Sequence, residues 1–506
     1  MGQSNRSISR TDLLGLAAAV ALALLFFGVN LWLQIAKYQA FHWSCFDYAN
    51  VAGLFEETLN GHFRYLDNTH IYALVLMPML LPQMLVYLLF PGALSLMILH
   101  ALFFASGVLL VYFAAKQVFR RPWAPLLFSF SLAFNPIYAI CSLSGLRNAA
   151  TILPAAFGAF IAWKARRKGW FIFCAAAICA TQINFAVGLF ALGFALYLFG
   201  SRDRLGRTAM LFSAAWLGCA VIVVVAFSLL TGIHLPAKMT HLSAFGGSFG
   251  DIVKGLFTGP GFFLAQLFYY QNFTLLLFFV PLLGLSFVRP AWLFGALPEL
   301  AYIAVSAYGH VNLDPRTAWA VNLHDGWFSY FTTGFLVVLP FVYLAAIEGA
   351  RRGADWLALR RPRLLSTRVG VSAAVAFILF TLTIHYFFTP GDYGPVPLTR
   401  HARFGEIVQT AHHRITREVL DSLPRNQSYL MTYTFYFFAN DIANRTLVTR
   451  ETPPTASYDR LVLDEQDPCP MTGNAFCRER LAQALADPRY ETISRRDGIY
   501  VLARKK

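Results

Sequence analysis

Apolar runs of about 20 residues recur from residue 12 to residue 388, and they constrain this chain more than any other feature of its sequence. An α-helix needs a stretch of that length to cross the hydrocarbon core of a bilayer. Only 13% of the residues are charged, about half the share found in soluble domains. Backbone groups inside lipid must bond within their own segment, and runs of this length favour helices over barrel strands. The sequence therefore predicts an all-α polytopic membrane protein.

The first apolar run, residues 12–34, follows two arginines and is too long for the core of a signal peptide. No small-residue cleavage site follows it, so we expect a retained helix. The formal net charge of +15 does not indicate nucleic-acid binding, because the basic residues lie where membrane topology favours them. We therefore expect the lipid bilayer, and no nucleic acid, as a partner.

Residues 70–92 decide the topology. Pro78 and Pro82 interrupt this apolar stretch, which favours a bent helix on the outer face over a straight span. With that choice the N-terminus is cytoplasmic, and about 11 spans are expected. They lie near 12–34, 93–115, 124–141, 148–163, 169–181, 185–200, 208–231, 271–288, 292–308, 328–349 and 369–388. Cytoplasmic connections then hold 19 Lys and Arg residues and external ones before residue 389 hold 6, as the positive-inside rule requires.

The chain changes character after residue 389. Residues 1–389 are assigned to the transmembrane domain, with juxtamembrane helices in its first external loop at 35–92. Residues 390–506 are more polar and predict an extracytoplasmic α/β domain. A polar helix is expected to end at Pro424, strands are expected at 428–435, 458–465 and 498–504, and a second helix at 475–487. Cys469 and Cys477 are the only cysteines of this domain and form a disulfide candidate for an oxidising compartment.

The first external loop contains Asp47 between two aromatic residues. At the membrane face a carboxylate has little water around it, so either its pKa is raised or a nearby cation keeps it ionised. Either state suits a general base or a metal ligand. The plain alternative is a solvated loop residue. Glu56, a candidate for binding substrate, lies nine residues further on, which is the opposite face of a continuous helix and makes the two acids no obvious catalytic pair. Histidines also occur in this loop but in no HExxH pattern. No cofactor is therefore assigned, and the binding of a divalent metal ion stays an open alternative.

Two later external loops carry basic and polar candidates. Lys238 and Lys254 lie among aromatic residues and suit the phosphate of a lipid, although lysines that snorkel at helix ends have the same pattern. The loop after residue 308 offers Arg316, His324 and Tyr330, as expected for the lining of a binding cavity.

Other polar residues have simpler interpretations. Gln182 and Asn184 in the stretch TQINF would lie near the outer leaflet, where hydrogen bonds between packed helices account for them. His412 and His413 are expected on the solvated face of the predicted polar helix. Ionisable residues are nearly absent from the expected spans, which counts against ion-coupled transport.

The order of these features resembles the GT-C superfamily of membrane glycosyltransferases, and more narrowly the prokaryotic membrane proteins of domain-of-unknown-function family 2079. The resemblance covers nearly all of the chain, and the ordered set of motifs carries it. These motifs are FDYANVAGLFEETLNG at 46–61, HIYALVLMPMLL at 70–81, GGSFGDIV at 246–253, the long stretch at 276–306, LDSLPRNQSYLMTYTF at 420–435, YDRLVLDE at 458–465 and DGIYVLAR at 497–504.

The resemblance implies an inverting glycosyltransferase of the inner membrane that moves a sugar from a polyprenyl-phosphate carrier to an extracytoplasmic envelope glycan or protein. Asp47 corresponds to the first-loop aspartate of the family and would act as general base. His70 corresponds to the histidine that opens the second juxtamembrane helix. The candidates for binding the phosphate leaving group are Arg147, Lys238, Lys254 and Arg316.

The sequence also departs from the family pattern. Ala52 stands where members often have a second acid, and Gln182 and Asn184 lie where many have an acidic or Lys-Glu pair. These departures leave two interpretations open, a different substrate or a scaffold that has lost catalysis. A transporter or flippase of lipid-linked glycans is a third, although the chain has no internal repeat of the kind transporters favour.

Overall fold

The computed structural model describes residues 9–59, 77–200, 202–231, 275–306, 327–360, 367–389, 394–439, 444–448, 458–467 and 474–505, with short pieces at 254–255, 258–259, 261 and 442. The chain divides into two compact units. The first comprises Met1–Asn30, Ile71–Gln83 and Leu99–Ala402, and the second Leu31–His70, Met84–Ile98 and Arg403–Lys506. The described residues after residue 30 in this first part of the chain therefore cluster with the C-terminal residues.

Five helices in the described part of the chain are long and apolar enough to cross a membrane. They are α1 (Arg10–Gln39), α5 (Ala93–Lys116), α11 (Arg204–Thr231), α16 (Trp327–Arg360) and α17 (Thr367–Phe388). A sixth crossing arises if α6 (Trp123–Ala133) and α7 (Pro136–Leu143), bent by 53°, form one span. The bend occurs where Pro136 removes a backbone donor and Asn135 accepts hydrogen bonds from the first amides of α7.

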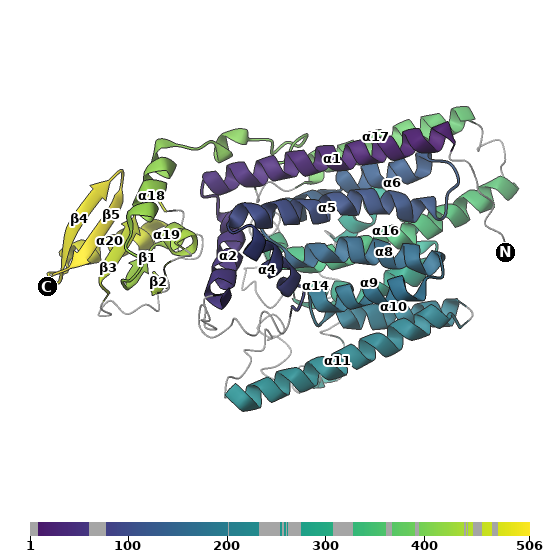
Figure 1. The fold of residues 1–506 in the computed structure, drawn as a ribbon. Coiled ribbons are helices and arrows are strands. Elements are labelled where there is room, and N and C mark those ends of the chain that lie inside the picture. The colour runs from purple at the N-terminus through teal and green to yellow at the C-terminus, as the bar shows by residue number, and fades with distance from the viewer. Residues whose placement is uncertain are drawn as a thin grey trace. The chain divides into compact units, whose positions relative to one another are not determined.

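Three shorter apolar helices pack beside these long ones in the first unit. They are α8 (Ile152–Lys164), α9 (Lys168–Thr181) and α10 (Phe185–Phe199), and Figure 1 shows them in one bundle with α5 and α16. The connection between α7 and α8 includes a 3-10 turn, η2 (Asn148–Thr151). The expected helical character of this unit is confirmed, whereas the expected number of about 11 spans stays a prediction.

The expected span at 271–288 is not a continuous α-helix in its described part. Residues 280–295 form short 3-10 turns at Val280–Leu282, Leu285–Phe287 and Pro290–Gly295, and α14 (Leu297–Ser306) follows. Pro281 and Pro290 each remove a backbone donor. Leu283 and Gly284 have φ values of 53° and 68°, the left-handed region in which a helix cannot continue.

The topology-deciding stretch at 70–92 is described from residue 77 onward. It contains α4 (Leu80–Leu89), a helix of 10 residues. At 1.5 Å per residue it is about 15 Å long, roughly half the thickness of the hydrocarbon core. This length suits a juxtamembrane helix and is too short for a full span.

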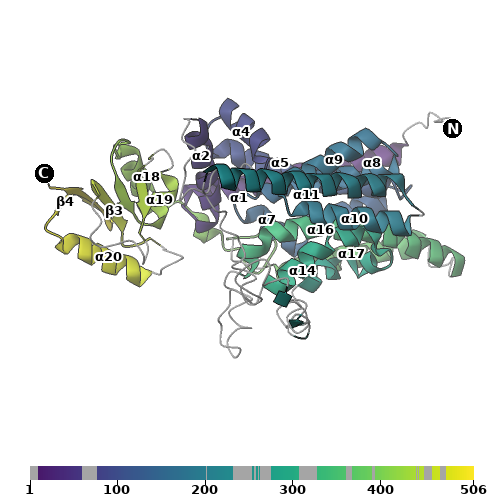
Figure 2. The ribbon, with the colours of Figure 1, turned by 90° about the horizontal axis from the view of Figure 1, so that it is seen from below.

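The second unit contains a five-stranded mixed sheet in the order β2-β1-β3-β5-β4. Strand β1 (Tyr429–Met431) pairs in parallel with β2 (Arg445–Leu447) and β3 (Arg460–Asp464). Strand β5 (Ile499–Arg504) pairs antiparallel with β3 and with β4 (Tyr490–Arg496). Helices α18 (Ala411–Ser422) and α19 (Tyr433–Phe438) cover one face, and α20 (Asn474–Ala486) covers the other (Figure 2).

Alternation along the strands divides the core into two layers. Val462 and Val501 pack with α18 and α19, whereas Leu461, Leu463 and Leu502 pack with α20. This is the period of two that a strand imposes, because successive side chains point to opposite faces of a sheet. Both faces are therefore buried along the central strands β3 and β5, whereas the edge strand β4 is mostly exposed.

Two details of this domain differ from the expectation. The expected strand at 428–435 ends at Met431, and the aromatic residues after it form α19, while β2 and β4 were not expected. The N–H of Thr434 in the first turn of α19 donates to the buried Asp467 carboxylate at 2.7 Å. The acceptor for this backbone N–H at the start of the helix lies 33 residues further on, so local sequence alone did not indicate the helix.

Candidate active site

Asp47 lies in the first turn of α2 (Phe46–Leu59), directly after a 3-10 turn at Trp43–Cys45. Its side chain is half-buried. The N-terminal end of a helix carries a partial positive charge, so the ionised carboxylate is stabilised at this position. Helix α2 is continuous from Asp47 to Glu56, which confirms that these two acids lie on opposite faces.

The residues just before Asp47 form a buried polar cluster. Cys45 is fully buried, and its Sγ lies 3.8 Å from the backbone oxygen of Gln34. Burial raises the pKa of Cys45 to about 11, against the lowering effect of Lys37 and with a further rise from Asp47. Burial also lowers the pKa of His42 to about 3, and the charge of Lys37 adds to this. A neutral imidazole and a protonated thiol therefore precede the candidate base.

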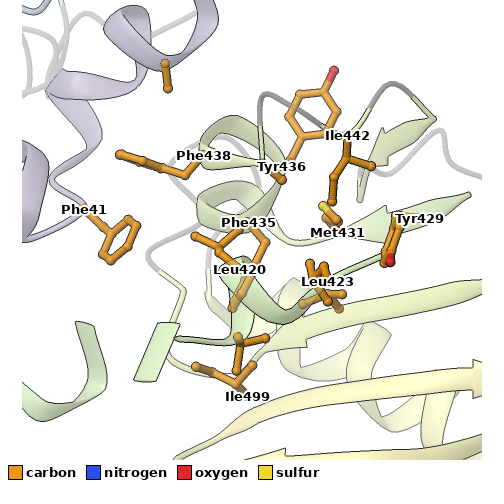
Figure 3. Close-up of a cluster of buried hydrophobic side chains, with 14 of the residues drawn as sticks. Phe41, Leu420, Leu423, Tyr429, Met431, Phe435, Tyr436, Phe438, Ile442 and Ile499 are labelled. Carbon is orange, nitrogen blue, oxygen red and sulfur yellow. The ribbon is translucent and has the colours of Figure 1, made fainter. Parts of the chain in front are cut away.

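Aromatic residues of the first loop complete the core of the C-terminal domain. Phe41 and Phe46 are buried in the same hydrophobic cluster as residues of α18, α19, β1, β3 and β5. Figure 3 shows the ring of Phe41 facing Phe438 of α19, at a centroid distance of 4.7 Å. The Arg417 guanidinium of α18 lies 4.7 Å from the centre of the Phe41 ring.

Phe46, the residue before Asp47, makes three ring contacts with α19. Its ring lies 4.6 Å from Tyr433, 5.3 Å from Phe437 and 5.4 Å from Phe438. Burying one such side chain contributes about 2–3 kcal/mol to folding. The start of α2 is therefore held by the C-terminal domain, and the backbone of Asp47 is held with it.

Glu56 has a different environment from the one expected of a free binding residue. Its carboxylate accepts a hydrogen bond of 2.5 Å from the hydroxyl of Tyr87 in α4. The Tyr87 ring also packs against Phe55 at 5.6 Å. Glu56 thus connects α2 to α4, and burial together with this hydrogen bond raises the pKa of Tyr87.

The remaining candidates are not gathered into one site by the described residues. Arg147 is half-buried, and its Nε donates to Ser144 at 3.2 Å. Lys254 is exposed. Tyr330 lies in α16, but its side chain is outside the described part. Residues His70, Lys238, Arg316 and His324 also lie outside the described residues.

Cys477 is buried in α20 and is disulfide-bonded. Cys469, its predicted partner, lies outside the described residues, so the pairing stays a prediction. No group of three or more His, Cys, Asp or Glu residues that could hold a metal ion occurs within the described ranges. The question of a divalent metal ion at Asp47 is thereby left open.

The expectation that His412 lies on a solvated face is wrong. Its Nε2 lies 3.0 Å from Asp464 of β3 and its Nδ1 lies 3.0 Å from Asp497. The side chain is only 16% exposed. The hydrogen bond to Asp464, with a smaller contribution from Asp497, raises the pKa of His412 to about 9. His412 is therefore a charged clamp between α18 and the sheet.

Two acids inside the helical unit were also missed. Glu348 of α16 is buried and forms ion pairs with Lys164 and, at 3.3 Å, with Arg289. Glu299 in the first turn of α14 accepts a hydrogen bond from Asn184 at 3.4 Å. These two glutamates are exceptions to the near absence of ionisable residues from the expected spans. Single acids inside apolar sequence were the available signal, because such residues rarely enter a membrane helix without a role.

The comparisons with known proteins cover nearly the whole chain. A family model described as a predicted membrane protein (DUF2079) matches residues 33–501. The crystal structure of ArnT from Cupriavidus metallidurans in the apo state is similar over 96% of this chain and 97% of that chain, with 14% sequence identity and a TM-score of 0.48. The search of curated proteins gives no match.

Proposed function

We propose that this chain, which belongs to the DUF2079 family of predicted membrane proteins, is a glycosyltransferase that uses a polyprenyl-phosphate-linked sugar. The acceptor is an envelope glycan or protein on the extracytoplasmic side of the inner membrane. The N-terminus is cytoplasmic, and the C-terminal domain lies on the acceptor side.

The observation that carries this proposal is the position of Asp47. It lies eight residues after the end of the long apolar helix α1, on a helix packed into the core of the α/β domain. A lipid-linked donor and a water-borne acceptor can meet only at the membrane face. A half-buried carboxylate on a fixed backbone suits proton removal there. The resemblance of the ordered motifs to GT-C enzymes gives the same residue this role.

The proposed reaction is a single displacement. The Asp47 carboxylate takes the proton of an acceptor hydroxyl while that oxygen attacks the anomeric carbon of the sugar. The bond between this carbon and the phosphate oxygen breaks, and the polyprenyl phosphate leaves with the electron pair. The new glycosidic bond has inverted configuration. A cation at the phosphate would stabilise the charge that develops on the leaving group, and Arg147, Lys238, Lys254 and Arg316 are the proposed sources.

A mass profile of envelope glycans tests the proposal. The strains are a deletion of the gene and the deletion complemented with wild type, Asp47→Asn or Asp12→Asn at matched protein levels. Asp12 is a matched control because it lies at the other end of α1, in an ion pair with Lys116. We expect a sugar mass to disappear in the deletion and to return with wild type and Asp12→Asn but not with Asp47→Asn. Restoration by Asp47→Asn would show that Asp47 is not the base and would favour a scaffold.

A further inference from the structure

Glu299 lies in the first turn of α14, the helix that follows the 3-10 turns of residues 280–295, and its side chain is half-buried. Its Oε2 accepts a hydrogen bond of 3.4 Å from the Nδ2 of Asn184, at the start of α10. Asn184 is exposed. The carboxylate and the amide therefore meet between two helices with part of their hydrogen-bonding capacity open.

The helix opposite makes room for this carboxylate. A Cβ atom added at Gly334 of α16 would lie 2.6 Å from Glu299 Oε1 and 3.0 Å from the Ile303 side chain. The first of these distances is shorter than Cβ contacts in proteins, so a side chain at residue 334 would force the Glu299 carboxylate to shift from this position. The position of the carboxylate is thus built from three elements, α10, α14 and α16.

A polar strip continues from Asn184 along the neighbouring helix ends. Gln182, between α9 and α10, is half-buried. The adjacent Thr181 hydroxyl lies 2.7 Å from that of Thr151 at the end of η2. The Oδ1 of Asn148 in η2 is buried and has no hydrogen-bond partner among the described residues. Polar groups thus extend over three helix ends, beyond what a single interhelical hydrogen bond would explain.

Glu348 and Glu299, both in this unit, differ in their partners. Glu348 is neutralised by Lys164 and Arg289. Within the described ranges, Glu299 has only the long hydrogen bond from Asn184, together with the favourable end of the α14 dipole. An acid placed inside a membrane unit without a cation costs stability, and such costs are typical of sites that bind ligands.

We propose that Glu299 and Asn184 bind hydroxyl groups of a carbohydrate inside the helical unit. A carboxylate accepts hydrogen bonds from two hydroxyls, and an amide both donates and accepts, which matches the mixed donors and acceptors of a sugar. A bound cation would need several oxygen ligands, and no group of three or more His, Cys, Asp or Glu residues occurs within the described ranges, which favours a sugar over an ion here. The identification of the ligand as a sugar rests on the proposed function.

The first measurement compares the thermal stability of the full-length protein, purified in a sugar-free detergent, with that of two variants. Glu348→Gln breaks a neutralised buried pair and should lower the melting temperature. Glu299→Gln removes a poorly compensated charge and should leave the melting temperature equal or higher. An equal loss of stability in both variants would mean that Glu299 is structural and would overturn the proposal.

The second measurement uses polyprenyl-phosphate glucose, mannose and galactose, with bare polyprenyl phosphate as the reference. The best sugar-carrying probe should bind wild type more tightly than bare polyprenyl phosphate. Glu299→Gln and Asn184→Ala should each weaken that probe about tenfold or more, as expected for a lost hydrogen bond to a charged group, and leave the bare carrier unchanged. Unchanged sugar binding in both variants, or no preference of wild type for any sugar-carrying probe, would overturn the proposal.

The two proposals fail in different ways. Asp47→Asn should retain binding of the sugar-carrying probe while losing transfer. If Asp47→Asn still transfers sugar but Glu299→Gln loses sugar binding, the base assignment is wrong and the carbohydrate site stands.

Discussion

The ring of Phe46 is stacked on the ring of Phe437, with centroids 5.3 Å apart and planes 9° from parallel. Phe46 opens α2, in the loop that follows α1, whereas Phe437 belongs to α19 in the C-terminal domain. Because Asp47 follows Phe46 directly, this contact holds the backbone from which the candidate base projects. The C-terminal domain thus acts as a support for the first loop.

Removing this stack should loosen the start of α2. Phe437→Ala should expose Cys45, which is fully buried in the native protein. We expect alkylation of Cys45 by a maleimide, measured by peptide mass spectrometry, to rise about tenfold, and sugar transfer to fall by about tenfold or more as the base is displaced. Phe437→Tyr keeps the ring and should behave as wild type.

The matched control for that variant is Leu481→Ala. Leu481 is buried on the opposite face of the same sheet, in the layer with α20. Both substitutions should cost the domain about 2–4 kcal/mol, but only Phe437→Ala should expose Cys45. Equal exposure of Cys45 in both variants would mean that general destabilisation is responsible and that the stack has no special role.

Glu56 and Tyr87 should behave as a structural pair. Tyr87→Phe removes the hydroxyl that donates to the Glu56 carboxylate, and Glu56→Gln weakens the same bond from the other side. Each should cost about 1–2 kcal/mol of stability and reduce transfer by similar, small factors. A much larger loss of transfer in Glu56→Gln than in Tyr87→Phe would instead assign substrate binding to Glu56.

His412 should make the stability of the C-terminal domain depend on pH. Asp464 and then Asp497 raise its pKa from 6.5 to about 9 in the folded protein. The folded value is the higher one, so the stabilisation is fully present below pH 6.5 and is lost as pH rises toward 9. We expect a loss on the order of 1 kcal/mol, reduced by solvent at this partly exposed site, in urea unfolding followed by pulse proteolysis.

The control for this pH dependence is His412→Gln. The glutamine cannot titrate, so its unfolding midpoint should change much less between pH 6.5 and 9 than that of wild type. A wild-type midpoint that is constant over this range would contradict the charged clamp.

The predicted Cys469–Cys477 disulfide closes a loop of about nine residues, for which loop entropy gives about 2–3 kcal/mol of stabilisation. The test is peptide mapping, without reduction, of protein isolated from membranes. It should recover the two cysteines in one disulfide-linked peptide. Cys469→Ser should lower the urea midpoint of the C-terminal domain to the same extent as Cys477→Ser. Additive effects of the two substitutions would mean that Cys477 has a different partner.

The membrane class and the end of α18 just before Pro424 were predictable from local sequence. The break near Pro136, inside the expected span at 124–141, was not expected, although its cause is also local. A span depends on the length of one apolar run, and a proline acts on its own turn of helix. The alternation in β3 and β5 is local for the same reason, since each residue's face is fixed by its neighbours in the strand.

The candidate site depended on distant partners. Asp47 could be selected as an acid at the membrane face, but its support by Phe437 could not, because α19 lies at the far end of the chain. The same holds for α19 capped by Asp467, His412 held by two aspartates, and Glu299 accommodated by Gly334. Sequence alone determined that the chain is a mostly helical membrane protein, since hydrophobic burial sums over neighbouring residues. Tertiary structure alone decided which charges are paired, because pairing depends on side chains that only folding brings together.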